Sequence, residues 1–381
     1  MNKSNNLQYL VGNGKISKKS TLPYNDNICD FLGDLSNELN LNKASNKYPD
    51  IKTLAFWCRK RNIFNLKNNF LSNHTRVGLG LIFHITPSNI PTNFAYSLIF
   101  GLITGNSNIV KVPSQNFEQV EIICKSINKI LKNKHKSIRD MISVVRYTNN
   151  DSYTKKISAI CNARLIWGGD NSISNIRKFT LNQRAIDIAF ADRYSFCVID
   201  TREILKLSNQ DIKRLVEKFY NDTYLVDQNA CSSPHLVLWL GNNLKEARTK
   251  FWKNLNVYVN KKYSLTETAS MDKYTQLCQN ILSLKNFKKY ERYDNFIYTI
   301  FLKNLDKNIH NLRGKWGLFY EYNINDLNKI KDFINNKYQT LTYFGLNKDI
   351  LKNFVLKNQL DGIDRIVPIG QALDISFFWD G

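Results

Sequence analysis

Cys231 lies in a loop of small and polar residues, Asp-Gln-Asn-Ala-Cys-Ser-Ser-Pro, at positions 227–234. A helical pattern precedes this loop and an apolar strand pattern follows it. A nucleophilic cysteine needs access to its substrate and help in losing a proton, because a free thiol has a pKa of about 8.5. Backbone N–H groups in such a loop can also stabilise an oxyanion. Without further context the residues favour the alternative, a loop cysteine that only packs.

Lys111 lies at the end of a predicted strand, and Asn89 and Ser114 lie just beyond predicted strands. The Asn89 amide can donate to a developing oxyanion or bond its own turn, and the sequence leaves these two roles equal. A lysine at the end of a buried strand is costly unless its ammonium group reaches the sheet edge or meets an anion. Lys111 is therefore a candidate for binding an anion, and Ser114 could bind the same anion. The alternative is an edge lysine whose aliphatic stem packs while its charge reaches water.

Gly168 and Gly169 stand where a short strand gives way to a helix. Glycine permits close backbone approach at such a junction, and the N-terminus of the following helix favours phosphate. The local sequence, Trp-Gly-Gly-Asp, is not the GxGxxG fingerprint and is a weak signal by itself.

The seven cysteines and five histidines show no metal-ligand spacing. No CxxC pair occurs, and the cysteines are spread through apparent core segments, which argues against both a disulfide framework and a zinc site. We expect no metal, and we expect His84 and His235 to be structural.

The residues that could carry chemistry are positioned by an α/β pattern. Residues 77–114 contain an apolar run at 79–85, a turn at 86–89, a helix-length segment at 93–103 and a β-branched run at 108–112. This order predicts a β-α-β unit. Open parallel sheets bind ligands at the carboxyl ends of their strands, so both strand ends would lie at the working edge.

The same alternation continues through predicted helices at 117–131, 152–161 and 211–225 and strands at 142–147, 164–167, 194–199 and 235–240. Strands alternating with helices predict a doubly wound parallel sheet. We predict a dinucleotide-binding domain with N-terminal helices at residues 1–200 and an α/β catalytic thiol domain at residues 201–381.

The formal net charge is +22, with 43% hydrophobic and 12% aromatic residues, a composition far from that of disordered chains. Clustered lysines would indicate nucleic-acid binding, but these are scattered, and we expect no nucleic-acid partner. A basic surface favours anionic ligands such as dinucleotides, coenzyme A or an acidic protein. Without a run of about 18 apolar residues or a signal-peptide core, we expect no membrane span and a cytoplasmic location.

Eight segments in a fixed order make the chain resemble the long-chain acyl-CoA reductase family (LuxC type) of the aldehyde dehydrogenase superfamily, which supplies aldehyde to bacterial luciferase. The segments span roughly residues 48–381 and read YPDIKTLAFWCRK, HITPSNIP, GNSNIVKVPS, IWGGDNSISNIR, SFCVID, DQNACSSP, KYQTLTYFG and DGIDRIVPIGQALDISFFWDG. The resemblance implies an aldehyde-dehydrogenase-like fold and NADPH-dependent reduction of a fatty acyl thioester to the aldehyde.

The resemblance also implies roles for the candidate residues. Cys231 would be the acyl-accepting nucleophile, and Asn89 would donate to the oxyanion of the thiohemiacetal. Lys111 and Ser114 would hold the adenosine ribose or its 2′-phosphate, and the glycine pair at 168 and 169 would line the pyrophosphate path. The implied partners are a fatty acyl-CoA or acyl-protein substrate, an acyl-protein synthetase and further copies of the chain in a homo-oligomer.

One departure from the superfamily concerns hydrolysis. Oxidative aldehyde dehydrogenases place a glutamate in a Glu-Leu-Gly-Gly segment to activate water, and the matching residues 188–195 here contain none. A reductase must avoid hydrolysing its acyl-enzyme, so this loss fits thioester reduction, although Asp192 could substitute as a base.

Alternatives from other classes stay open. The chain could reduce a shorter acyl-CoA, or it could be an inactive or basic binding protein of the same fold. A nucleic-acid-binding protein would need its lysines on one face and an affinity that falls steeply with salt.

Overall fold

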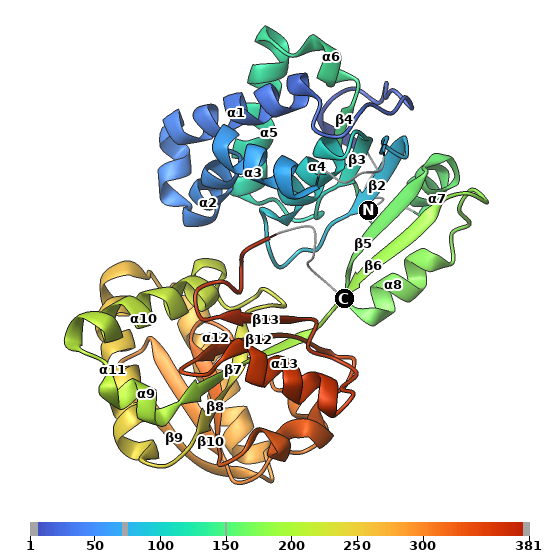
Figure 1. Ribbon diagram of the computed structural model, residues 1–381. Helices are drawn as coiled ribbons and strands as arrows, with labels where there is room; N and C mark the ends of the chain where they lie inside the picture. The colour runs from blue at the N-terminus through green and yellow to red at the C-terminus, as the bar shows by residue number, and fades with distance from the viewer. Residues whose placement is uncertain (1–6, 71–74, 149–150, 376–381) are drawn as a thin grey trace, which may run out of the picture. The chain divides into compact units, whose positions relative to one another are not determined.

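The computed structural model describes residues 7–70, 75–148 and 151–375 (Figure 1). The chain divides into two compact units, Met1–Asp192 and Arg193–Gly381. The predicted boundary at residue 200 falls at the end of strand β7 (Tyr194–Asp200). This strand lies wholly in the second unit. That the first unit binds a dinucleotide and the second carries the thiol chemistry stays a prediction.

A six-stranded sheet with the strand order β1-β4-β3-β2-β5-β6 forms the centre of the first unit. Its strands are parallel except β1, which runs antiparallel to β4. The strands are β1 (Gln8–Val11), β2 (Leu81–Ile85), β3 (Ser107–Lys111), β4 (Ile142–Arg146), β5 (Ala163–Gly168) and β6 (Ile186–Ala191). The helices are α1 (Asp26–Leu41), η1 (Lys43–Lys47), α2 (Pro49–Trp57), α3 (Lys60–Phe70), α4 (Asn93–Ile103), α5 (Glu118–Asn133), α6 (Lys136–Arg139), α7 (Asp151–Ile160) and α8 (Asp170–Arg177).

A seven-stranded sheet with the order β13-β12-β7-β8-β11-β10-β9 forms the centre of the second unit. Only β9, paired with β10, is antiparallel. After β7 the strands are β8 (Pro234–Leu240), β9 (Phe287–Tyr293), β10 (Ile297–Leu302), β11 (Leu318–Ile324), β12 (Tyr338–Phe344) and β13 (Arg365–Pro368). The helices are α9 (Thr201–Lys206), α10 (Asn209–Thr223), η2 (Tyr224–Val226), α11 (Leu244–Lys262), α12 (Glu267–Ser283), η3 (Ile309–Asn311), η4 (Leu327–Phe333) and α13 (Lys348–Lys357).

The predicted α/β class with parallel sheets is confirmed. Central strands such as β2 and β4 are buried along their whole length, as expected for parallel strands covered on both faces. Two strands of the first unit, β1 and β6, were not predicted, and neither were strands β9 to β13 of the second unit. β1 has only four residues, and β6 is partly exposed, so neither shows a buried apolar run.

A buried ionic cluster fixes helix α11 to the second sheet. The Glu321 carboxylate, fully buried on β11, accepts hydrogen bonds from the Trp239 and Trp252 indoles at 2.8 and 2.6 Å. The Arg248 guanidinium donates to it and also pairs with Glu291 at 3.2 Å. A buried charge destabilises a fold unless its partners satisfy it, so these side chains must act together.

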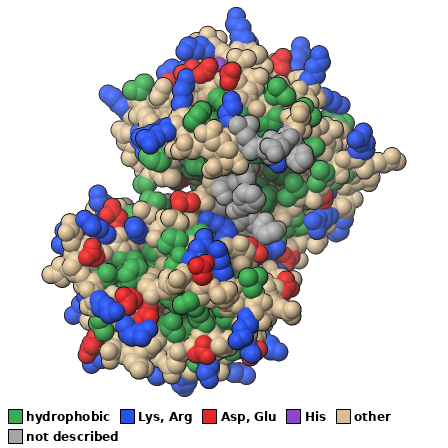
Figure 2. Space-filling model, viewed as in Figure 1, with side chains coloured by type: hydrophobic (Ala, Val, Ile, Leu, Met, Phe, Trp, Pro, Cys, Tyr) green, Lys and Arg blue, Asp and Glu red, His purple; other side chains and the backbone are tan. Residues whose placement is uncertain are grey.

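Lys and Arg side chains are scattered among acidic and polar ones over the face shown in Figure 2. None of the helices in the described ranges combines the length and the apolar character that crossing a membrane requires.

We predict that the stability of the first unit falls in acid because His84 is buried as a neutral ring. Burial lowers the pKa of His84 from 6.5 to about 4. Between about pH 6.5 and pH 4 the His84 ring is protonated in the unfolded chain but stays neutral in the folded chain. The free energy of unfolding therefore falls as the pH falls. This effect should cost about 2 kcal/mol between pH 7 and pH 5.

Urea unfolding of the wild type and His84→Gln at both pH values measures this difference. The variant, although less stable overall, should lose less free energy on acidification. An equal loss in both proteins would contradict the prediction.

Candidate functional site

Cys231 is half-buried in the loop between η2 and β8, at the amino-end edge of the second sheet. Four other cysteines, at 58, 124, 161 and 197, are buried, and burial raises the pKa of each thiol. Buried thiols of this kind are poor nucleophiles. Cys29 and Cys278 are also half-buried, but both lie on helices. Cys231 thus lies in a loop, as the sequence predicted for a candidate nucleophile.

The side-chain amide of Gln228 holds the Cys231 loop through three hydrogen bonds, which we call the Gln228 clasp. Its amide nitrogen donates to the carbonyl oxygens of Pro234 and Leu318, both at 3.1 Å, and its amide oxygen accepts from Gly317 N–H at 3.2 Å. Asp227 and Gln228 both adopt left-handed backbone conformations, with φ of 53° and 62°. Such conformations are unfavourable for side-chain-bearing residues and persist only where surrounding contacts impose them.

Gly317, whose N–H donates to the Gln228 amide oxygen, is the third partner in the Gln228 clasp. Its φ is +87°, and a Cβ added there would lie 2.2 Å from the Phe296 carbonyl oxygen. Only glycine fits this position, so the segment that meets the Gln228 amide is sterically specified. Sequence reasoning missed Gln228 and Gly317, because nothing in the sequence shows that residues about 90 positions apart meet.

Ser195 ties the backbone of Cys231 to the neighbouring strands. Its hydroxyl donates to the Cys231 carbonyl oxygen at 2.6 Å and accepts from Thr340 N–H at 3.1 Å. The nucleophile candidate is therefore anchored to β7 and β12 as well as to its own loop.

His235, close to Cys231 in sequence, makes the contacts of a packed residue. Its Nδ1 accepts from Gly314 N–H at 3.2 Å, and its ring stacks on Tyr194 with centroids 5.6 Å apart. Burial first, then the charge of Arg313, lower the pKa of His235 to about 3. A ring that stays neutral in this way is poorly suited to stabilise a thiolate.

The other candidates from the sequence lie at the carboxyl-end edge of the first sheet. Asn89 is exposed in the turn after β2, Lys111 ends β3, and Ser114 is exposed just beyond it. Lys111 is half-buried, and its Nζ lies 5.1 Å from the centre of the Tyr147 ring. Burial lowers the pKa of Lys111. An anion at this edge would offset the cost of burying the ammonium group.

Gly168 ends β5, and Gly169 is the N-cap of α8. A Cβ added to Gly169 would meet no atom of the described residues within 4 Å, so the backbone there is open to approach. At Gly168 it would lie 3.3 Å from the Ser172 Cβ. Since β3, β2 and β5 are parallel neighbours, one sheet edge gathers these glycines with Asn89, Lys111 and Ser114.

Trp167, which sequence reasoning did not single out, lies beside the glycine pair. Its ring stacks on Phe190 with centroids 3.9 Å apart and planes 13° apart, and its indole N–H donates to Ser97 Oγ at 3.3 Å. Ser97 Oγ is 2.8 Å from His84 Nδ1, and His84 Nε2 is 2.9 Å from Asn108 Oδ1. A buried polar chain therefore orients an aromatic surface at the carboxyl-end edge of the sheet.

Strand β6 carries Phe190, which lies in the stretch 188–195 that matches the glutamate segment of oxidative aldehyde dehydrogenases. Its only carboxylate, Asp187, is paired with Arg164, whose Nη2 lies 2.8 Å away. Asp192 is exposed just beyond the strand.

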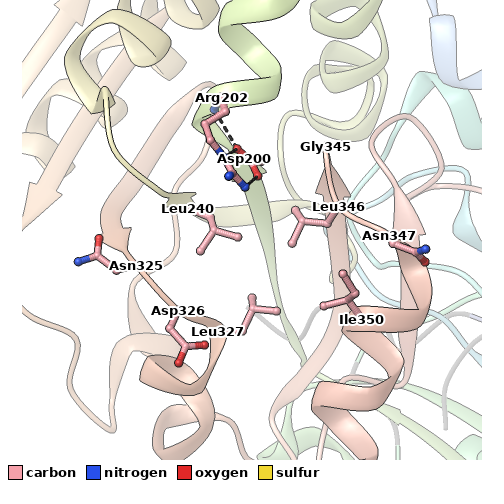
Figure 3. Close-up of a pocket in the computed structure, with 10 residues that line it drawn as sticks. All are labelled: Asp200, Arg202, Leu240, Asn325, Asp326, Leu327, Gly345, Leu346, Asn347 and Ile350. Atoms are coloured by element: carbon pink, nitrogen blue, oxygen red, sulfur yellow. Dashed lines mark hydrogen bonds and ion pairs between the residues drawn. The ribbon is translucent and has the colours of Figure 1, made fainter.

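A cavity of ≈ 290 Å³ opens at the carboxyl ends of β7, β8, β11 and β12 (Figure 3). Leu240, Leu327, Leu346 and Ile350 are its apolar lining. Its polar side chains cap the neighbouring helices, as when Asp200 accepts from Arg202 N–H at 2.8 Å. Because Cys231 precedes β8, it lies at the opposite edge of the same sheet from this cavity.

Among the described residues, no group of three or more His, Cys, Asp or Glu side chains is placed to hold a metal ion.

Comparison with known proteins gives a family and a fold. Residues 34–381 match the family described as "Acyl-CoA reductase (LuxC)". A "Long-chain acyl-protein thioester reductase" of Photorhabdus luminescens is 22% identical over 295 residues, covering 75% of this chain and 57% of that protein. The chain thus spans little more than half the length of this relative.

Solved structures of similar fold are aldehyde dehydrogenases and related oxidoreductases. An oxidoreductase from Marinobacter aquaeolei has a TM-score of 0.65 at 12% identity, over 95% of this chain and 82% of that one. Aldehyde dehydrogenase 21 from Physcomitrella patens has a TM-score of 0.62 at 12% identity, over 91% and 78%. The predicted aldehyde-dehydrogenase-like fold is confirmed.

We predict that Ser195→Ala destabilises the Cys231 loop. The change leaves the Cys231 carbonyl and the Thr340 N–H without their buried partner, at a cost of about 1–3 kcal/mol. Hydrogen exchange followed by mass spectrometry should show faster exchange in peptides covering residues 229–233 and 338–342.

Thr299→Val is the matched control, because the buried Thr299 hydroxyl has no hydrogen-bond partner among the described residues. It should leave exchange in both peptides unchanged. Equal exchange in the two variants would refute the anchoring role of Ser195.

Proposed function

Because the chain belongs to the acyl-CoA reductase (LuxC) family, we propose that it reduces a fatty acyl thioester to the aldehyde with NADPH, through an acyl-enzyme on Cys231. The observation that carries the proposal is the clasped loop at the start of β8. This loop holds a half-buried thiol at a strand end, while the cysteines at 58, 124, 161 and 197 are fully buried.

The proposed chemistry begins with the Cys231 thiolate. It attacks the thioester carbonyl carbon, and the carbon–sulfur bond to the donor breaks, so that the donor leaves as a thiol after taking a proton. The acyl group is then held as a thioester on Cys231. Reduction of this thioester gives a thiohemiacetal, which collapses to the aldehyde and returns the thiolate.

Asn89 is proposed to donate its side-chain amide to the oxyanion of the tetrahedral species. Asn89 is exposed in the turn after β2, at the carboxyl-end edge where a parallel sheet ordinarily receives its ligand. Each such donor is typically worth about 3 kcal/mol in the transition state.

The carboxyl-end edge of the first sheet fits a dinucleotide. Lys111 offers a cation, Ser114 a hydroxyl, and Gly169 an open backbone position at the N-terminus of α8. When bound there, NADPH supplies the hydride for the reduction. We propose that Lys111 and Ser114 hold the ribose or its 2′-phosphate and that Gly168 and Gly169 line the pyrophosphate path.

Protection from hydrolysis is proposed to follow from β6. Phe190 on β6 lies in the stretch where a hydrolytic enzyme has its base, and its ring stacks on Trp167 of β5. The carboxylate of β6, Asp187, is paired with Arg164. With no glutamate in this stretch to activate water, the acyl-enzyme is proposed to persist until it is reduced.

The acyl donor is proposed to be a fatty acyl-CoA or an acyl-protein, which present the same thioester. The relative from Photorhabdus luminescens is named for an acyl-protein substrate. A partner synthetase that presents the acyl group and assembly into a homo-oligomer complete the proposal.

We predict that Cys231→Ser abolishes both protein acylation and aldehyde release. Radiolabelled acyl-CoA with and without NADPH measures the two steps separately. Cys58→Ser should retain acylation and lose only stability, because that thiol is buried. Full acylation of the Cys231 variant would refute the assignment.

We also predict that Lys111→Met weakens NADPH binding about tenfold or more while leaving acylation of Cys231 unchanged. Methionine keeps the packing of the stem and removes the charge. Isothermal titration should show a smaller loss for NADH, which lacks the 2′-phosphate. Unchanged affinity for NADPH would mean that Lys111 is an edge residue only.

A further inference from the structure

The amino-end edge of the second sheet carries a cation as well as the thiol. Strands β13, β12, β7 and β8 are parallel neighbours, so their first residues share one edge. Arg365 begins β13 and pairs with Thr340, whose N–H is bound by the same Ser195 hydroxyl that holds the Cys231 carbonyl. The sheet register therefore places Arg365 and the Cys231 loop on the same edge.

The guanidinium of Arg365 is held in a fixed orientation. Nη1 donates to the Ala372 carbonyl oxygen, and Nη2 donates to those of Gln371 and Asp374, all at 3.1 Å. Three bonds from one planar group to one turn leave it little rotational freedom. Its position is set before any substrate arrives.

Asp222, at the end of α10, links this turn to the Cys231 loop. Its buried carboxylate accepts from Gly370 N–H at 2.6 Å and Ala372 N–H at 2.9 Å. Its backbone carbonyl accepts from the Ser233 hydroxyl at 2.7 Å. One residue thus fixes the turn that orients Arg365 and the loop that carries the thiol.

We propose that Arg365 stabilises the thiolate of Cys231 and is the positioning residue that activates this nucleophile. This inference rests on the proposed role of Cys231 in acyl transfer. A nearby guanidinium favours the charged form of a thiol, and an arginine stays protonated at every physiological pH.

The charges around the pair agree with this assignment. Burial lowers the pKa of Arg365, while Asp374, Cys231 and Asp222 oppose that effect, in line with the position of Arg365 and the Cys231 loop at one edge of the sheet. Burial, together with the charges of Arg313 and Lys315, lowers the pKa of His235, so its ring stays neutral and does not supply the cation. Burial raises the pKa of Asp222 to about 7, so this carboxyl adds little negative charge beside Arg365 below neutral pH.

The test is the pH profile of Cys231 alkylation by iodoacetamide, followed by mass spectrometry of the peptide that contains it. The full-length wild type, Arg365→Gln and Arg365→Lys are compared. In Arg365→Gln the profile should move to higher pH, with alkylation at pH 7 about tenfold slower. Arg365→Lys keeps the charge and should stay close to the wild type.

Equal shifts in the two variants would show a structural role and overturn the proposal, as would an unchanged profile in Arg365→Gln. Arg313→Gln is the control for the general positive field, and an equal shift there would also overturn it. If Arg365→Gln does not fold, Arg365→Met, which keeps the apolar stem, replaces it. Alkylation needs neither thioester nor NADPH, so failure of the reductase assignment would leave this result readable.

Discussion

The buried amide of Gln228 is the contact on which the thiol loop depends. It satisfies two carbonyl oxygens and one N–H group from two separate segments, at Pro234 and at Gly317 and Leu318, while its own backbone is left-handed at φ 62°. An unsatisfied buried polar group costs about 1–3 kcal/mol, so these bonds hold the loop in a conformation that it would otherwise avoid. Ser195 adds a second anchor at the Cys231 carbonyl. The thiol is therefore presented by a rigid frame.

The proposed function uses opposite edges of the two sheets. In the first, the strands end at Lys111 and Gly168, where a parallel sheet ordinarily receives a nucleotide. In the second, the thiol precedes β8, and the carboxyl-end cavity has polar side chains that already cap helices. The tendency of parallel sheets to bind ligands at the carboxyl ends of their strands therefore points to this cavity and not to Cys231.

The chain belongs to the acyl-CoA reductase family and has the aldehyde dehydrogenase fold. The proposed reduction needs a thiol that accepts an acyl group and a surrounding that does not deliver water to it. Trp167 of β5 stacks on Phe190 of β6 in the first unit, and in the second unit Arg365 is proposed to take the role of the histidine that activates many catalytic cysteines. Both features are properties of side chains placed by the fold.

The sequence by itself determined the α/β class, the strands from β2 to β5, and the loop in which Cys231 lies, because apolar runs and turn residues are local signals. It also indicated that Lys111 and Gly168 lie at strand ends and that Asn89 lies just beyond one. Only the tertiary structure joined Gln228 to Gly317, Ser195 to Thr340 and Asp222 to Ala372, since each pair is separated by about 90 to 150 positions. Local patterns carry no information about which distant strands become neighbours, and the environment of the thiol is built from those neighbours.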